Sequence, residues 1–467
     1  MSLDPAHSSA LEIAIAVRAR RVTALAVTQS ALARIEATHP QLNAFTTVTA
    51  ERALAEAAAV DSMLTAGRDP GLLAGAPYAV KNLFDLAGIT TVAGSKINRS
   101  NPPAMTDASA VARLKAAGAV CLGALNMGEY AYDFVTENAH DGATRNPHDL
   151  SRSAGGSSGG CGAAVAAGLV PLSLGTDTNG SIRVPSSFCG IWGLKPTYGR
   201  LCRTGSFPFV DSLDHIGPFA RSVSDLAAAY DIMQGPDFND HACAQRSVDP
   251  VLRTLEIGLG NLRIATLGGY FERGGSPQAH AAVAEIAAAL TTKRKVEFPE
   301  VAVARAAAYT ITASEGGHFH LDRLRTRAAD FDPNARDRFI AGALIPSAWY
   351  TRAQKFRAWW REQVREVFRH VDVLIAPATP VPATLIGQEK MTLDGRELLV
   401  RPNLGIFTQP ISFVGLPVIA APLHIMGLQP IAVQLIAAPW CESQLFRVAQ
   451  VLEHCGICSA PVAKLAA

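Results

Sequence analysis

The chain lacks a marked excess of charge of either sign. Asp, Glu, Lys and Arg together make up 18% of its 467 residues, and the formal net charge is +2 at pH 7. It has no basic tail, which argues against a nucleic-acid surface as its main function. It also has no internal repeat and no low-complexity segment. These absences leave an ordinary globular composition, typical of an enzyme.

Long uninterrupted apolar runs are missing too. No stretch of about 18 residues is free of Gly or Pro breaks, so we expect no transmembrane helix and no membrane partner. Residues 1–21 lack the continuous apolar core that follows a basic start in a secretory signal peptide. The eight cysteines are scattered, which favours reduced thiols. We therefore expect a soluble, cytoplasmic enzyme.

One cysteine pair has the spacing of a redox or zinc site. Two residues separate Cys455 from Cys458, and His454 precedes the pair. A structural zinc site needs four ligands, and no second CxxC or HxxxH motif supplies the rest. We expect these residues to end a C-terminal helix, with Gly456 as its C-cap. The chain is expected to hold no metal and no cofactor.

The spacing of apolar residues predicts helices and short strands that alternate. At this length two domains are the general expectation, and a strand–helix–strand order is typical of an α/β fold, in which helices flank a sheet. The predicted helices cover residues 9–36, 50–66, 107–117, 277–291, 349–370 and 442–452, and the predicted strands cover 76–80, 119–122 and 372–377.

Two segments of the C-terminal half carry more specific signals. Aromatic residues recur along the 349–370 helix, and such a stripe favours burial in a core. Asp394-Gly395 predicts a β-hairpin between residues 390–393 and 396–400. The aromatic residues expected to be buried are Trp359, Trp360 and Phe368.

The most informative segment runs from Gly155 to Tyr198. It presents Ser157 and Ser158 on one glycine-rich loop and Ser181 on another, around one small-residue helix. Glycine-rich turns occur where backbone must approach something closely or adopt unusual dihedral angles. The segment has no histidine that could complete a Ser-His-Asp triad, so a serine nucleophile here needs another base. Lys81, at the end of a predicted strand, is the candidate.

A lysine can serve as that base only while it is neutral. Its unperturbed pKa is about 10.4, and burial disfavours the ammonium form and lowers the pKa. Lys81 follows Tyr78-Ala79-Val80, a setting suited to such burial. Taken alone, however, Lys81 could be a salt-bridged structural lysine, and the serines could be helix N-caps or turn residues.

Together these residues resemble the amidase signature family over nearly the whole chain. The resemblance implies one α/β domain over residues 1–467, built on a large mixed β-sheet core flanked by helices. Its parts would be N-terminal helices (1–66), a catalytic core (about 70–235) and a substrate-pocket and C-terminal part (about 236–467). Further matching blocks, in the family's order, are Gly193–Thr197, Ser212–Pro218, Ile375–Pro377, Gly415–Pro417 and Val433–Ile436.

The resemblance also assigns roles. Ser181 is similar to the family nucleophile, Ser157 to the serine that follows a cis peptide bond and relays a proton, and Lys81 to the general base. Backbone N–H groups of the Ser181 loop would bind the developing oxyanion, and two charged residues would brace that loop. The oxyanion-hole candidates are Thr178, Asn179, Gly180 and Ser181, and the bracing residues are Asp177 and Arg183.

Two positions narrow the class of amide that could be the substrate. In the glutamine-cleaving A subunit of the tRNA amidotransferase, an arginine binds the substrate carboxylate and an aspartate binds its ammonium. By the resemblance Arg357 matches the arginine, while Gly405 stands at the aspartate position. This favours a small amide that bears a carboxylate and no amino group. A solvated charge on a helix face is an equal alternative for Arg357.

Several segments resemble one branch, the carboxybiuret hydrolases of cyanuric acid degradation. The resemblance implies deamination of 1-carboxybiuret to urea-1,3-dicarboxylate and ammonia. It also implies a small helical partner subunit, similar to the C subunit of the amidotransferase, and leaves a homodimer of the large chain open. His140 and Glu129 are candidate pocket residues, with loop stabilisation an equal alternative. The segments are 79–85, 93–99, 136–140, 181–185, 311–317 and 435–440.

Three alternatives stay open. The first is a broad-specificity amidase, the second a glutaminase of the tRNA amidotransferase type, and the third a catalytically inactive scaffold. Gly405 counts against the glutaminase, and the presence of Lys81, Ser157 and Ser181 counts against the scaffold.

Overall fold

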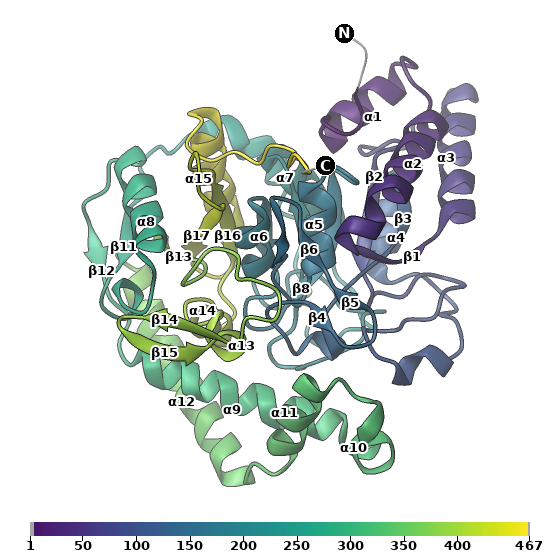
Figure 1. The fold of residues 1–467 in the computed structure, drawn as a ribbon. Coiled ribbons are helices and arrows are strands. Elements are labelled where there is room, and N and C mark those ends of the chain that lie inside the picture. The colour runs from purple at the N-terminus through teal and green to yellow at the C-terminus, as the bar shows by residue number, and fades with distance from the viewer. Residues whose placement is uncertain (1–3, 466–467) are drawn as a thin grey trace.

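A mixed β-sheet of eleven strands runs through the computed structural model, which describes residues 4–465 (Figure 1). Its central pairs of strands are antiparallel, and parallel pairs lie on both sides of them. In spatial order the strands are β1 (Phe45–Val48), β3 (Val120–Leu125), β2 (Pro77–Lys81), β8 (Leu172–Asp177), β10 (His215–Ala220), β9 (Trp192–Lys195), β16 (Val418–Leu423), β17 (Ile431–Ala437), β13 (Val373–Pro377), β11 (Ile264–Leu267) and β12 (Lys295–Val296).

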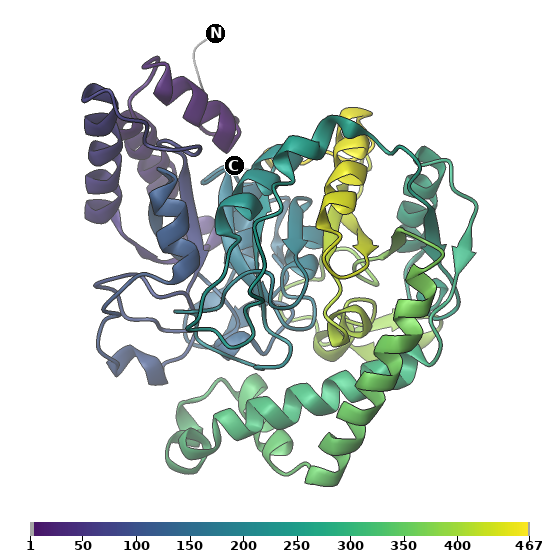
Figure 2. The same cartoon turned by 180° about the vertical axis from the view of Figure 1, so that it is seen from behind.

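Strands β2, β8 and β17 are buried along their whole length, as expected for a sheet that helices cover on both faces. Helices cover both faces of the sheet. Helices α5 (Gly159–Ala166) and α6 (Arg183–Cys189) pack against one face, and α7 (Val223–Met233) and α15 (Glu442–His454) cover the other, which is seen from behind in Figure 2. The large mixed sheet flanked by helices is the fold class that the sequence predicted.

The N-terminal segment forms three helices beside the β1 edge of the sheet (Figure 1). The periodic stretch 9–36 is two helices rather than one, α1 (Ala10–Arg18) and α2 (Ala24–Leu42), followed by α3 (Ala50–Thr65). The side chain of Ser9 accepts a hydrogen bond from the Glu12 N–H, and that of Thr23 accepts one from the Ala26 N–H. Each of these N-caps begins its own helix, so the helical conformation is interrupted between α1 and α2.

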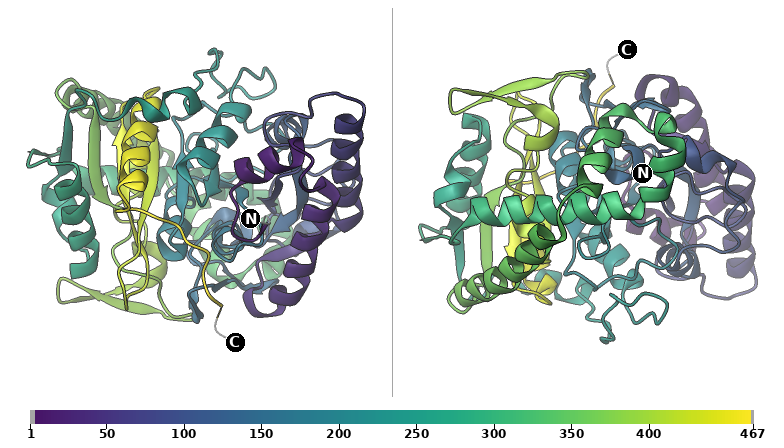
Figure 3. Two further views of the ribbon diagram at one scale, coloured as in Figure 1. Left: turned by 90° about the horizontal axis from the view of Figure 1, so that it is seen from above. Right: turned by 90° about the horizontal axis from the view of Figure 1, so that it is seen from below.

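A second helical layer, α9 (Val301–Phe319), α11 (Pro333–Ala343) and α12 (Ser347–Phe368), crosses one end of the molecule. It lies at the bottom of Figure 1 and nearest the viewer on the right of Figure 3. Helices α9 and α11 pack closely, since a Cβ on Gly342 would lie 1.9 Å from the Ala313 carbonyl oxygen. This layer covers the loops that follow β8.

The remaining elements connect these layers. The other helices are α4 (Ser109–Ala116), α8 (Pro277–Ala289), α10 (Leu321–Arg327), α13 (Val400–Asn403) and α14 (Gln409–Phe413). Short 3₁₀ helices cover Ile97–Ser100, Glu129–Ala131, Leu252–Ile257, Gly269–Glu272 and Ala328–Asp330. Three two-stranded sheets pair β4 (Glu137–Asn138) with β5 (Gly142–Ala143), β6 (Arg145–Asn146) with β7 (Asp149–Ser153), and β14 (Lys390–Leu393) with β15 (Arg396–Leu399).

The expected burial of Trp359 is wrong. Its exposed fraction is 44%, whereas Trp360 is fully buried and donates its indole N–H to the Pro299 carbonyl oxygen at 2.6 Å. Phe368 is half-buried. Neighbouring residues on a helix point about 100° apart, so Trp359 and Trp360 do not both face the core.

The predicted hairpin and the end of the last helix are confirmed, but the C-cap of that helix is Cys455 rather than the predicted Gly456. The hairpin at Asp394-Gly395 forms between β14 and β15. Helix α15 ends at His454, and Gly456 follows the cap residue Cys455 with a φ of +72°. None of the helices among residues 4–465 combines the length and the hydropathy that a membrane span requires.

Candidate active site

The site forms where two parallel strands end. Strands β2 and β8 lie side by side, and the carboxyl ends of parallel strands meet at the same edge of a sheet. Lys81 is the last residue of β2, and Asp177 is the last residue of β8. The loop after β8 carries Ser181, so the sheet brings the predicted base and the predicted nucleophile to one edge.

Lys81 is fully buried. Its Nζ donates hydrogen bonds to Ser157 Oγ at 2.8 Å and to Thr176 Oγ1 at 2.8 Å. Removal from water lowers the pKa of Lys81 to about 8, and the charges of Asp214 and Asp177 oppose this shift only in part. A substantial fraction of the side chain is therefore neutral near neutral to mildly alkaline pH.

Ser157 contacts the end of strand β2 through Lys81. The peptide bond that joins it to Gly156 is cis. A Cβ on Gly156 would lie 2.5 Å from the Val135 backbone nitrogen, so only glycine lets the two segments approach this closely. Within residues 4–465 no hydrogen bond joins the hydroxyls of Ser157 and Ser181. Such contacts are often long in unliganded sites and shorten when substrate binds.

The loop from Thr178 to Ser181 has free backbone donors. Among the described residues, none of its four N–H groups donates to a protein acceptor. Gly180 has a φ of +142°, and a Cβ there would lie 2.3 Å from Thr408 Oγ1. The Asn179 carbonyl oxygen accepts a 2.6 Å hydrogen bond from that same hydroxyl. The loop is therefore held in place while its amides stay available for an oxyanion.

A buried ion pair joins Asp177 and Arg183, which lie on either side of this loop in the sequence. Arg183 Nε donates to Asp177 Oδ2 at 3.0 Å and its Nη2 donates to Oδ1 at 2.9 Å, and neither side chain is exposed. Arg183 Nη1 also donates to Gln434 Oε1 at 2.7 Å. The guanidinium holds the pKa of the Asp177 carboxyl far below its usual range, against the opposing effect of burial. These contacts match the bracing predicted for both residues.

Side chains of the loop make two further anchors. Asn179 Nδ2 donates to Thr312 Oγ1 of α9 at 2.9 Å, and Thr178 Oγ1 donates to Asp214 Oδ1 at 2.6 Å. The other oxygen of Asp214 accepts the N–H groups of Phe209 and Val210 at 2.8 and 2.9 Å. Asp214 thus ties the Thr178 loop to the loop that carries Phe209.

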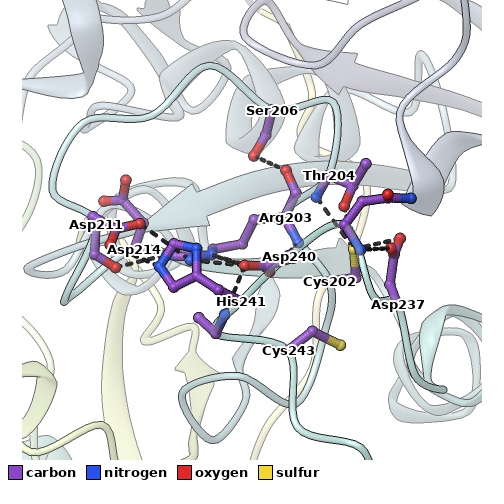
Figure 4. Close-up of polar contacts among 12 residues, drawn as sticks. Cys202, Arg203, Thr204, Ser206, Asp211, Asp214, Asp237, Asp240, His241 and Cys243 are labelled. Carbon is purple, nitrogen blue, oxygen red and sulfur yellow. Dashed lines mark hydrogen bonds and ion pairs between the residues drawn. The ribbon is translucent and has the colours of Figure 1, made fainter.

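The Phe209 loop is itself anchored by charge. Arg203 Nη2 donates to Asp240 Oδ1 at 2.8 Å and to Asp211 Oδ1 at 3.2 Å, and His241 lies 2.9 Å from the other oxygen of Asp211 (Figure 4). This network is an ion-pair scaffold, because each charged group in it already has a partner.

Ser181 faces a small pocket of about 10 Å³. The walls come from the Thr178–Ser181 loop, residues 131–134, Phe209, Gln409 and helices α9 and α11. A larger cavity of about 570 Å³ lies beside it, and Tyr309 and Arg338 line both. Across residues 4–465 no group of three or more His, Cys, Asp or Glu side chains is placed to hold a metal ion.

The comparisons with known proteins agree with this geometry. The protein family described as Amidase matches residues 26–446. The chain belongs to the amidase family. It is therefore a hydrolase that acts on amide bonds.

Two relatives and one solved structure show which amidases this chain is most similar to among those compared below. It is 56% identical to AtzE, the 1-carboxybiuret hydrolase subunit of Pseudomonas sp. (strain ADP), over 96% of this chain and 98% of that protein. It is 38% identical to the A subunit of the glutamyl-tRNA(Gln) amidotransferase of Roseiflexus sp. (strain RS-1), over 93% of each chain. A solved structure of a vestigial protein complex that reveals the evolutionary origins of an s-triazine catabolic enzyme matches with a TM-score of 0.96 and 55% identity, over 97% of this chain and 100% of that one.

Arg357 does not line the Ser181 pocket of this amidase. Its Nε donates to the Phe413 carbonyl oxygen at 2.6 Å and its Nη2 donates to the Ser212 carbonyl oxygen at 2.8 Å. Its exposed fraction is only 8%, so the solvated helix face is not its setting either. Two of its donor groups already join α12 to the end of α14 and to the loop that carries Ser212, and the side chain acts there as a packing bridge.

Glu129 and His140 also lie outside the pocket lining. His140 Nε2 lies 3.1 Å from Glu129 Oε1, and that carboxylate also accepts the Ser95 hydroxyl at 2.7 Å and the Asp332 N–H at 2.7 Å. Burial raises the pKa of Glu129, and these partners oppose the shift. The pair joins three loops, which is the stabilising alternative for these residues.

The structure adds residues to the site that the sequence did not indicate. Thr176 contacts the predicted base, and Tyr132, Phe134 and Arg338 line the pocket. The position of Thr176 near the carboxyl end of β8, the strand beside β2, could have suggested it. The sequence around Arg338 has no comparable signal, since its relation to Ser181 depends on how α11 packs.

Proposed function

We propose that Lys81, Ser157 and Ser181 form the catalytic triad of this amidase and that it deaminates 1-carboxybiuret to urea-1,3-dicarboxylate and ammonia. The observation that carries the mechanism is the 2.8 Å hydrogen bond between Lys81 and Ser157 in a fully buried setting. A lysine with a lowered pKa accepts a proton from a serine, and that serine relays it from the nucleophile.

In the first half-reaction Ser181 Oγ attacks the terminal carbamoyl carbon. Its proton passes to Ser157, whose own proton passes to neutral Lys81. The carbonyl oxygen becomes an oxyanion and is bound by the free N–H groups of the Thr178–Ser181 loop. When the carbon–nitrogen bond breaks, the relay returns a proton to the leaving nitrogen, and ammonia departs.

In the second half-reaction water attacks the acyl group on Ser181. Lys81, through Ser157, again takes the proton, now from water. Collapse of the tetrahedral intermediate releases a carboxylate and restores the Ser181 hydroxyl. With 1-carboxybiuret as substrate, the released acid is urea-1,3-dicarboxylate.

The substrate assignment has two supports. One is the 56% identity to a 1-carboxybiuret hydrolase subunit over nearly the full length of both chains. The other is the environment of Gly405, where a Cβ would lie 2.5 Å from Phe134 Cζ. An aromatic ring thus fills the space that an aspartate side chain would need, and a substrate ammonium would find no charged partner there.

The test is ammonia release from freshly generated 1-carboxybiuret by the wild type and by Ser181→Ala. We expect release by the wild type and its loss in the variant. Glutamine and acetamide serve as control substrates. Faster release from glutamine would favour the amidotransferase-like alternative, and faster release from acetamide would favour a broad-specificity amidase.

We also propose that the chain folds as one domain and works with a small helical partner protein. The support for the partner is the 0.96 TM-score to a chain from a structure described as a protein complex. Purification of the chain with and without a coexpressed candidate partner, followed by size-exclusion chromatography with light scattering, tests it. A chain that is monodisperse and fully active alone would contradict the need for a partner.

A further inference from the structure

We propose that the side chain of Asn179 selects ureido substrates by accepting a hydrogen bond from the N–H group next to the scissile carbamoyl group. This inference rests on the proposed function, because it takes the substrate to have the form H₂N–CO–NH–R, as 1-carboxybiuret does. A carboxamide of the form H₂N–CO–CH₂–R has no such N–H group. The Ser181 loop would then recognise the substrate through a side chain as well as bind the oxyanion through its backbone.

Asn179 lies in the pocket that Ser181 faces. Both residues line this pocket of about 10 Å³, and they belong to the same loop. The backbone N–H of Asn179 is one of the free donors described above. The side chain is a separate polar group, and its exposed fraction is 6%. A polar side chain buried this close to the nucleophile contacts a substrate that reaches Ser181.

The side-chain amide of Asn179 is used at one end only. Its Nδ2 donates to Thr312 Oγ1 at 2.9 Å, and the backbone carbonyl oxygen accepts the Thr408 hydroxyl at 2.6 Å. Its Oδ1 is buried and has no hydrogen-bond partner within residues 4–465. A buried acceptor without a partner is unfavourable, so a ligand N–H that pairs with it gains affinity. The two existing contacts hold Oδ1 in position for such a donor.

The mechanism indicates which part of the substrate meets Oδ1. The leaving nitrogen takes a proton from Ser157, so it must lie on the side of Lys81. The other substituent of the carbamoyl carbon then points away from the relay, toward the wall that Tyr309 and Thr312 of α9 contribute. Asn179 is hydrogen-bonded to that helix. Tyr309 also lines the neighbouring cavity of about 570 Å³, which has room for the rest of the substrate.

A neutral amide oxygen suits this position better than a carboxylate. The carbonyl oxygen of the substrate becomes an oxyanion in the same pocket, and a carboxylate beside it would oppose that charge. The Asn179 oxygen accepts an N–H without adding a charge. A carboxamide places a CH₂ group there and leaves the oxygen unpaired, so the site discriminates against it.

The experiment uses two ligands that differ only at this position. N-carbamoylglycine has an N–H group where succinamate has a CH₂ group, and both carry a carboxylate. Their dissociation constants are measured by calorimetry on Ser181→Ala, which lacks the nucleophile. We expect N-carbamoylglycine to bind roughly tenfold more tightly. Adding Asn179→Leu, which keeps the size but removes the acceptor, should weaken N-carbamoylglycine roughly 10- to 100-fold and succinamate by less than about threefold.

Thr312→Val tests the anchor, because it removes the acceptor of the Asn179 N–H and keeps the shape of the side chain. We expect it to reduce the preference for N-carbamoylglycine by less than Asn179→Leu does. In chains with Ser181 intact, both variants should lower kcat/KM for 1-carboxybiuret in the same order. Asn239→Leu is the control variant, since Asn239 is exposed and lies outside the pocket lining. It should match its parent with every ligand.

Equal weakening of both ligands in Asn179→Leu would assign Asn179 a structural role and overturn the proposal. Ser181→Ala without a preference for N-carbamoylglycine would overturn it too. If Asn179→Leu does not fold, an unchanged preference in Thr312→Val contradicts the proposal. A wild type that releases no ammonia from 1-carboxybiuret, although the Asn179-dependent preference is present, would overturn the proposed substrate alone.

Discussion

Lys81 Nζ and Ser157 Oγ lie 2.8 Å apart, although they are separated by 76 positions in the chain. Strand β2 ends at one partner, and the glycine-rich loop before α5 carries the other. The lysine lies among neutral hydroxyls, with no carboxylate in direct contact within the described residues. An ammonium without an adjacent counter-ion is poorly stabilised there, so this pairing favours the neutral base.

The pH dependence of kcat/KM should report the pKa of Lys81. Its pKa in the folded protein is about 8. The protonated form is inactive as a base, so the rate should rise about tenfold per pH unit at low pH and level off above about pH 8. The measurement is initial-rate kinetics from pH 6 to 10, with unfolding checked at each pH. Lys81→Arg should be inactive throughout, and a plateau already reached at pH 6.5 would contradict the lysine base.

Asp177→Asn should destabilise the fold strongly. The substitution leaves the buried Arg183 guanidinium without its counter-charge, which costs about 3–5 kcal/mol. Urea unfolding followed by circular dichroism measures the loss. Asp337→Asn removes an exposed pair with Arg336 and should cost less than about 1 kcal/mol. Similar losses in the two variants would mean that burial of the Asp177 pair contributes little.

Gly180→Ala should abolish most of the activity. The new methyl group would lie 2.3 Å from Thr408 Oγ1, on a residue whose φ is +142°, so the loop must move its amides away from the oxyanion position. Losing one such donor lowers kcat roughly 10²- to 10³-fold. Gly258 also has a positive φ, of +71°, but open space around its Cβ position. Gly258→Ala should therefore cost stability but keep full kcat, and equal kcat values in the two variants would contradict the assignment.

The two neighbouring tryptophans of α12 should differ sharply in how much stability is lost when each is replaced by alanine. Trp360→Ala removes a fully buried ring and its hydrogen bond to Pro299, and we expect a loss of about 3–5 kcal/mol. Trp359 is 44% exposed, so Trp359→Ala should cost less than about 1 kcal/mol. Unfolding midpoints of the two variants test this directly. A larger loss for Trp359 would place that ring in an interface with another chain.

Much of the candidate site could be predicted from the sequence because its parts are local. The glycines at 155, 156 and 180 are required by close backbone approaches and positive φ values, and such requirements leave a mark in the residue types themselves. The serines sit on those same loops. Lys81 was indicated by the apolar strand before it, and the structure confirms that it is buried. The roles of these residues stay predictions until they are measured.

The sequence by itself determined the α/β class, the family and the loops that carry Lys81, Ser157 and Ser181. It did not determine which arginine faces the pocket or which tryptophan of α12 faces the core. Arg338 and Arg357 are both arginines on amphipathic helices, and only the packing of α9, α11 and α12 over the end of the sheet separates their surroundings. The physical reason is that backbone turns and apolar periodicity are encoded locally, whereas the partners of a long charged side chain depend on segments far away in the chain.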